Sequence, residues 1–241
     1  MKFNIMKLSK TRFLFIPLFF AILGGLAPTM GWGVTARAIF LGAGSDSPTS
    51  AVIIAGEKKI EIDLPRRNLS SEVKLPNDVL KAAVLSQAPA SGEAIDPAAP
   101  VVTLPQNSGR VLLLFLPDPK NKVFPVSVRV IDASTAKFPA GHSVLFNLTN
   151  HTVAGKFGGK PISVVGGRSK LIDPPRTKGN GYPVLISYKA PQEEKWKVLC
   201  SSTWMQSPKS RQLIFVMHPP GRRSPRIWSV FDHPQVARNT E

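Results

Sequence analysis

The sequence predicts an all-β fold with little or no helix after the N-terminal segment. Residues 59–64 and 126–130 alternate apolar and polar side chains at the period of a half-buried strand. Residues 111–116 and 213–217 are continuously apolar, which is typical of central strands covered on both faces, although short buried helices share this pattern. The 23 prolines, nearly twice the usual share of about 5%, fall between such runs, as turns and edge positions do. Together these features favour one or two immunoglobulin-like or cupredoxin-like sandwiches.

Shorter candidate strands occupy much of the remaining chain. They cover 37–41, 143–148, 153–157, 162–165, 170–172, 184–188 and 227–231. The glycine pairs at 158–159 and 166–167 divide the middle of this set into consecutive hairpins. One helix is plausible over 79–86, after Asn77 and Asp78 as caps, although the same residues also suit a strand.

Composition divides the chain into five segments. Residues 87–109 are rich in Ala, Pro and Ser, and the balance of charge changes across them. The expected segments are a signal peptide at 1–36, an N-terminal β unit at 37–87, a linker or long loop at 88–108, a basic β sandwich at 109–233 and a flexible tail at 234–241. Two joined β units and one sandwich with a long crossover both fit this division.

The N-terminal segment has the pattern of an export signal. Four basic residues within 1–12 precede an uncharged apolar run over 13–26, and small residues follow at 34–38. This order predicts secretion to the periplasm, cell envelope or medium, with a mature chain beginning near Arg37 or Ile39. The uncharged stretch extends to residue 36, however, so it is also long enough for an uncleaved membrane anchor of about 20 residues.

Positive charge is concentrated in the C-terminal part. Residues 37–100 carry 7 Lys or Arg against 8 Asp or Glu, whereas residues 101–241 carry 20 against 7. In an exported chain this favours an anionic polymer, an anionic membrane surface or an acidic protein as partner, rather than nucleic acid. Arg222, Arg223 and Arg226 form the densest cluster and are the candidate polyanion-binding residues. The simpler interpretation is that most of these charges are solvated outer faces of strands.

Metal-binding motifs are weak. Cys200 is the only cysteine, so no internal disulfide forms, and strand alternation predicts a buried, inert thiol. Cys200 and Met205, with His142 or His151, have the residue types of a blue-copper site, but the second histidine expected between Cys and Met is absent. We therefore expect no cofactor and no metal.

Catalytic motifs are equally sparse. Residues 141–145 begin like a nucleophile elbow but lack its second glycine. Asp132 and Asp173 are the one carboxylate pair worth inspecting. The aromatic residues Trp196, Trp204, Trp228 and Tyr188 either fill the core or, if exposed beside basic side chains, stack on an acidic glycan.

The segment NLTNHTVAGKFGGK at 147–160 resembles the central hairpin of a family of exported bacterial proteins of unknown function. The resemblance spans roughly residues 58 to 233 and includes 173–176, 182–184, 200–204, 211–216, 221–223 and 226–230. It implies a compact β-rich exported protein and assigns no activity or site residue.

The expected function is therefore binding without catalysis. We expect a module that binds or assembles on an anionic envelope polymer or an acidic partner protein, and that contacts a membrane only if the N-terminal segment is uncleaved. A secreted hydrolase without a recognisable local motif is the alternative. A flat basic patch would favour the first, and a deep polar cleft with convergent Asp, His or Ser the second.

Overall fold

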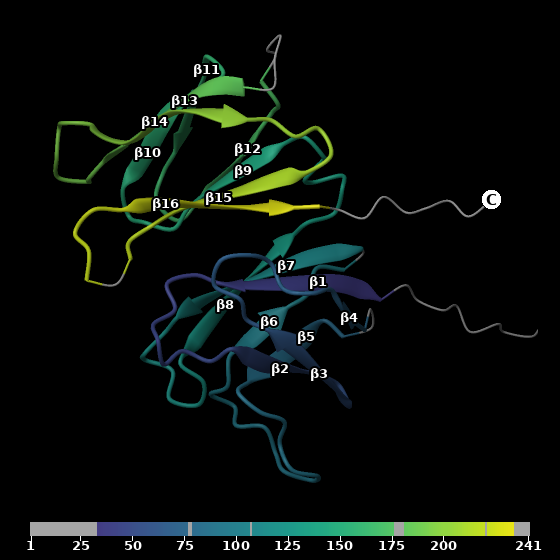
Figure 1. Cartoon of the computed structure of the whole chain (residues 1–241). Coiled ribbons are helices and arrows are strands. Elements are labelled where there is room, and N and C mark those ends of the chain that lie inside the picture. Colours follow the sequence, from purple (N-terminus) through teal and green to yellow (C-terminus); the bar gives the residue numbers. More distant parts are fainter. Residues whose placement is uncertain (1–32, 77–78, 107, 176–180, 220, 234–241) are drawn as a thin grey trace, which may run out of the picture. The chain divides into compact units, whose positions relative to one another are not determined.

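The prediction of an all-β protein is confirmed. The computed structural model describes residues 33–76, 79–106, 108–175, 181–219 and 221–233, which contain sixteen strands and no helix (Figure 1). The strands are β1 Val34–Phe40, β2 Ser50–Ala55, β3 Lys58–Asp63, β4 Val73–Leu75, β5 Lys81–Leu85, β6 Val101–Thr103, β7 Arg110–Pro117, β8 Val126–Asp132, β9 Ser143–Asn147, β10 Thr152–Phe157, β11 Lys160–Val164, β12 Ser169–Ile172, β13 Gly181–Lys189, β14 Lys197–Met205, β15 Arg211–Met217 and β16 Arg226–Asp232.

The strands form two β sandwiches. In the first, a sheet of order β4-β1-β7-β8 faces a sheet of order β3-β2-β5-β6 across a core that includes Phe40, Ile53, Val84 and Phe115. In the second, a sheet of order β12-β9-β15-β16 faces a sheet of order β11-β10-β13-β14 across a core that includes Phe157, Ile186 and Val216. Period-two alternation on facing sheets thus produces both cores.

The two sandwiches have the same topology. Adding eight to each strand number of the first gives the strand order of the second, in both sheets. The parallel pair β1–β7, in which Arg37 lies opposite Leu112, corresponds to the parallel pair β9–β15, in which Val144 lies opposite Leu213. The β strands therefore form a tandem repeat of one eight-stranded unit.

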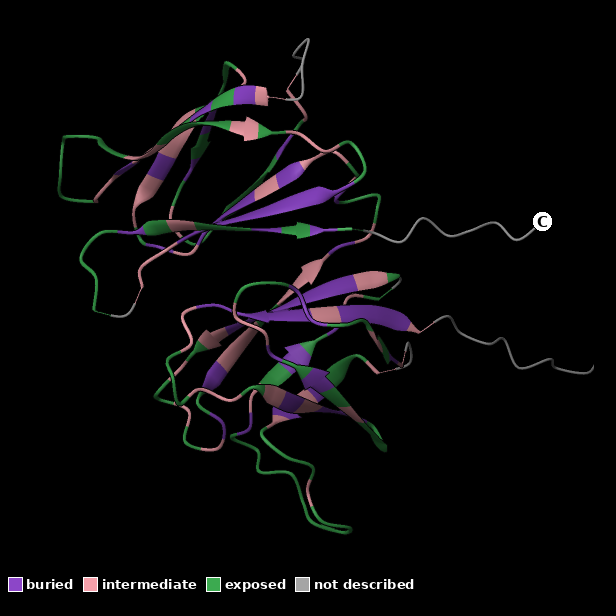
Figure 2. Ribbon diagram, viewed as in Figure 1, coloured by how far each residue is buried: buried purple, intermediate pink, exposed green. Residues whose placement is uncertain are grey.

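A third apolar cluster joins equivalent faces of the two repeats. Ile39 of β1 and Leu114 of β7 belong to the same buried cluster as Phe146 of β9 and Phe215 of β15. The phenyl rings of Phe146 and Phe215 stack with centroids 5.3 Å apart. β1, β7 and β15 are consequently buried along most of their length (Figure 2), which explains the continuous apolar runs predicted to be doubly covered strands.

The expected domain boundary is wrong. The segment 88–108 does not separate two sandwiches, because it contains β6, and β7 and β8 complete the sheet of β1. The first sandwich thus extends to Asp132, and the second begins with β9 at Ser143. Alternation reports which face of a strand is buried, but it does not report which strands pair.

The helix considered over 79–86 is also wrong. Residues Lys81–Leu85 form β5, whose Ala82 and Val84 are buried in the first core while Lys81 is exposed. The cap candidates Asn77 and Asp78 lie outside the described residues.

The export segment is mostly outside the described residues, as is the tail at 234–241. Within the part of the chain that is described, no helix is long and apolar enough to cross a membrane. β1 begins at Val34, so residues 34–36 of the expected signal peptide are strand residues.

Candidate functional site

The three predicted arginines are exposed on one side of the second sandwich. Arg222 and Arg223 lie in the turn that follows β15, and the amide of Arg222 donates to the carbonyl of Pro219 at 3.1 Å. Arg226 is the first residue of β16 and lies opposite Met217 of β15. It is therefore part of a strand rather than of the turn.

Arg226 lines a pocket that also contains two arginines from the first repeat. The cavity has a volume of about 380 Å³, and Arg66 and Arg67 lie on its wall together with Trp228 and Met217. Residues 40–43, which end β1 and follow it, complete the lining with Pro219 and Ile227. We call this cavity the basic pocket.

Two of the three arginines are free to meet a ligand. Arg67 and Arg226 are exposed, and no ion pair involves either of them within the described ranges. Arg66 is half-buried, and its guanidinium donates to the carbonyls of Ser45 and Ser47 at 3.1 Å each, which holds the 42–49 loop beside the pocket. Unneutralised guanidinium groups beside an apolar wall suit an anionic group carried on an apolar or ring-shaped body.

Arg66 and Arg67 were not predicted as site residues from the sequence. They stand more than 150 positions before Arg226, in a half of the chain whose net charge is close to zero. The adjacent pair of arginines after Pro65 was the available local signal, but only the fold brings it to β16.

The aromatic residues divide between surface and core. Trp228 in the basic pocket is 39% exposed, and Trp196 is exposed with the Lys189 ammonium 5.6 Å from its ring centroid. Trp204 packs edge-on against Phe157, with centroids 5.7 Å apart, and Tyr188 is buried. Trp228 is therefore the aromatic residue that can stack on a ligand in the basic pocket.

A second cavity opens between the edge strands of the second sandwich. Its volume is about 510 Å³, and its apolar wall comes from Leu199, Cys200 and Trp204 of β14 and from Ile227 of β16. We call this cavity the edge groove. Cys200 faces the core beside Ile186 but is only half-buried, so the prediction of a buried thiol is wrong in degree.

The residues considered for copper are dispersed. His142 lies 3.9 Å from Asp173, Cys200 lies in the edge groove, and Met205 is exposed at the end of β14. Among the described residues, no three His, Cys, Asp or Glu side chains are close enough together to hold a metal ion.

The considered catalytic groups do not converge either. The Ser143 hydroxyl is buried and donates to Oε1 of Gln212 at 3.3 Å, and Ser143 opens strand β9 rather than an elbow. Asp132 accepts from the Ser108 hydroxyl at 2.8 Å, whereas Asp173 is exposed near Lys160. Burial would raise the pKa of Asp132, but hydrogen bonds from Ser134 and Ser108 outweigh it and lower the pKa. Asp132 is thus held as a structural carboxylate.

Asn147, in the segment that carries the family resemblance, organises the loop before β10. Its amide donates to the carbonyls of His151 at 2.7 Å and Val164 at 2.9 Å, and its carbonyl oxygen accepts from the Thr149 hydroxyl at 2.7 Å. This arrangement positions His151, whose Nε2 lies 2.9 Å from Nε2 of His218. The resemblance thus falls on a structural motif.

His151 should make the protein less stable in mild acid. Burial lowers its pKa, and the nearby charge of His218 adds to this effect. Because the pKa is lowered in the folded state, the unfolded chain takes up the proton first as pH falls below about 6.5, and stability declines until the folded-state pKa is passed. Urea unfolding at pH 7 and pH 5 should show a smaller decline for His151→Gln than for the wild type. The exposed His233→Gln variant is the control, and an unchanged decline in His151→Gln would contradict the prediction.

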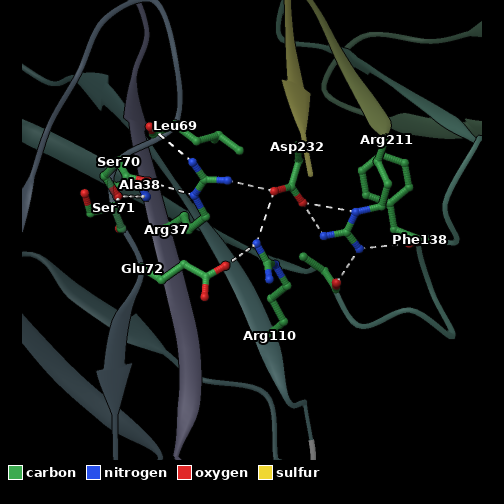
Figure 3. A network of polar contacts seen from close by, with 11 residues as sticks. Arg37, Ala38, Leu69, Ser70, Ser71, Glu72, Arg110, Phe138, Arg211 and Asp232 are labelled. Atoms are coloured by element: carbon green, nitrogen blue, oxygen red, sulfur yellow. Dashed lines mark hydrogen bonds and ion pairs between the residues drawn. The ribbon is translucent and has the colours of Figure 1, made fainter. Parts of the chain in front are cut away.

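A buried ionic network links the two repeats (Figure 3). Asp232 at the end of β16 has no exposed surface, and its Oδ1 accepts from Nη1 of Arg37 at 3.0 Å and Nη2 of Arg110 at 3.2 Å. Its Oδ2 accepts from Nε of Arg211 at 3.0 Å and also from Nη2 of that arginine. Arg110 in turn pairs with Glu72 at 2.7 Å.

Among the arginines of the network, Arg211 has the largest effect on the pKa of Asp232. Burial alone would raise the pKa of Asp232, but the hydrogen bond and charge of Arg211, helped by Arg110 and Arg37, lower it below its usual value. Nη1 of Arg211 donates to the carbonyls of Ala133 at 2.7 Å and Phe138 at 2.8 Å. The Asp232–Arg211 pair at its centre is enclosed by protein groups and therefore serves the fold rather than a ligand.

Comparison with known proteins adds no family to this picture. No family model matches the chain, and no curated protein matches it. The all-β sandwich class is therefore the level at which the fold defines the protein, and function has to be argued from the basic pocket and the edge groove.

Proposed function

We propose that this protein is an exported binding module, without catalysis, that holds an anionic envelope polymer or the acidic surface of a partner in the basic pocket. One observation carries the proposal. Arg66, Arg67 and Arg226 come from separate repeats and line one pocket beside Trp228, while Arg67 and Arg226 form no ion pair within the described residues. Clustered cations cost folding energy through repulsion, so their gathering favours a role in binding.

The surroundings of the pocket favour a polymer over a small anion. Arg222 and Arg223 continue the positive surface into the turn before Arg226, and both are exposed. A repeating polyanion contacts several guanidinium groups at once, and each contact releases counterions, so affinity falls steeply with salt. An acidic sugar unit can also stack on the exposed face of Trp228.

Replacing Arg67 and Arg226 by Ser should weaken binding to a sulfated polysaccharide such as heparin by at least about tenfold, because the loss of even one charge-assisted hydrogen bond costs about 1.5–3 kcal/mol and about 1.4 kcal/mol is a factor of ten. The salt dependence of binding should also become shallower. Titration at two salt concentrations measures both effects.

The control is Lys156→Ser with Arg168→Ser, which removes the same charge from exposed positions elsewhere on the second repeat. Equal losses in both double variants would show non-specific attraction and contradict the pocket. A loss found only when Arg222 and Arg223 are replaced would transfer the site to the turn. Each exposed arginine should change the free energy of unfolding by only a few tenths of a kcal/mol.

Export is proposed from the signal pattern of the first 36 residues. A start near Arg37 or Ile39 would remove Val34 and Ala36, which are buried in β1 and pair with β4. Gly31 and Gly33 are small residues suited to a cut before Val34, which leaves β1 whole. Intact-mass analysis of the protein from its native host should therefore give a chain beginning at Val34. A chain beginning at Arg37 would contradict a start at Val34. A chain that retains Met1 and is found in membranes would establish the uncleaved membrane anchor.

A further inference from the structure

The two repeats differ at one edge, and the first repeat shows how that edge is closed. Phe124 is 1% exposed, and it packs in the first core together with Val126, the first residue of β8. β8 is the edge strand of its sheet and contacts β6, the edge strand of the opposite sheet.

The corresponding residues of the second repeat fill this edge less completely. Leu116 lies opposite Ser127 in β7–β8, and Met217 lies opposite Arg226 in β15–β16. Counting back from these equivalent pairs, Val126 corresponds to Pro225, and Phe124 corresponds to Arg223. Pro225 is buried as Val126 is, but Arg223 is exposed, so no aromatic ring enters the second core from this position.

The edge groove is the space that results. Leu199, Cys200, Trp204 and Ile227 are core-facing side chains that remain only partly buried, and Ser229 lines the groove where Val130 stands in the first repeat. Apolar side chains left half-covered along this open surface groove of about 510 Å³ favour an apolar group supplied from outside.

The groove is bordered by a long free strand. β14 has nine residues and pairs with β13 alone among the described strands, whereas β6 has only three residues. Val198 of β14 is 64% exposed. A long unpaired edge offers backbone donors and acceptors to an incoming extended segment.

We propose that the edge groove binds an extended segment of a partner protein, which pairs with β14 and inserts a bulky apolar side chain where the first repeat has Phe124. Arg222, Arg223 and Arg226 border the same end of β16, so acidic residues beside the inserted side chain are favoured. The groove and the basic pocket share Arg226 and Ile227. Cys200 and Trp204 line only the groove, whereas Arg67 and Trp228 line only the basic pocket, so variants at these unshared residues test the two binding proposals separately.

Cys200 supplies the measurement, because it is the only cysteine and lines the groove. The probe is a peptide of alternating Val and Thr with one central Phe and two Asp at each end. The control is the same peptide with Ser in place of Phe. The Phe peptide should slow alkylation of Cys200 in the native protein at least tenfold and saturably, and the Ser peptide should not. Equal rates with both peptides at millimolar concentration would overturn the proposal.

Two variants make the test independent of the peptide design. Arg223→Phe should fill the groove from within, so that Cys200 is alkylated more slowly without peptide and the Phe peptide no longer binds. Arg222→Phe places the same ring one position away and should leave both measurements unchanged. If protection of wild-type Cys200 rises with protein concentration, the groove is occupied by a second copy of this chain, and the proposal of a partner protein is wrong. Heparin binding should persist in Arg223→Phe with at most the loss of one contact, which separates this proposal from the basic pocket.

Discussion

Replacing Asp232 by Asn should lower the free energy of unfolding by about 3–5 kcal/mol, the range for removing one partner from a buried ion pair. The side chains of Asp232 and Arg211 have no exposed surface, and Arg37 and Arg110 also direct guanidinium groups at the same carboxylate. Without that carboxylate, Glu72, which pairs with Arg110, is the one remaining acidic partner of the three arginines among the described residues. Urea unfolding followed by tryptophan fluorescence measures the loss.

The matched control is Asp173→Asn, because Asp173 is exposed and should change stability by no more than about 0.5 kcal/mol. The acid side of the stability curve gives a second check. The pKa of Asp232 is lowered in the folded state, so its contribution is present above pH 4 and is lost as pH falls below the ordinary value of 3.8 towards the folded-state pKa. Asp232→Asn should remove that part of the acid slope. A loss below 1 kcal/mol would mean that the network is solvated.

Replacing Phe124 by Ala should cost about 3–5 kcal/mol, the range for truncating a buried phenylalanine, because it removes the ring that closes the first core. Phe124 is 1% exposed and packs with Val126 among residues of both sheets of the first sandwich. Equilibrium unfolding measures the cost. Phe231→Ala is the control, since Phe231 in β16 is 47% exposed and its truncation should cost less than about 1 kcal/mol.

The outcome for Phe124 also tests the comparison between the repeats. A small cost would mean that the first core closes without this ring, and the open edge of the second repeat would then need no external side chain. A large cost, together with a stable second repeat that carries Arg223 at the equivalent position, supports the different roles of the two edges.

The tandem repeat explains why the network and the apolar contact between repeats occur together. Arg110 and Arg211 each begin the strand that pairs in parallel with the first strand of its repeat, and both bind Asp232. Leu112 and Leu213 follow two residues later in both strands and share one buried cluster. Equivalent faces of the two repeats therefore meet. Their contact is ionic where the two arginines bind Asp232 and apolar where the two leucines pack. The recurrence of Arg before an apolar run was visible in the sequence, but its meaning depended on the pairing of strands.

The sequence by itself determined the all-β class and the strands that are covered on both faces. These properties are local, because the alternation of side chains and the placement of prolines reflect the faces of one strand and its turns. Tertiary structure alone decided that β7 and β8 belong to the first sandwich, that Arg66 and Arg67 join Arg226, and that Asp232 is buried among three arginines. The physical reason is that strand pairing and ion pairing connect residues far apart in the chain, and a one-dimensional pattern of polarity does not encode which distant strand satisfies a given edge.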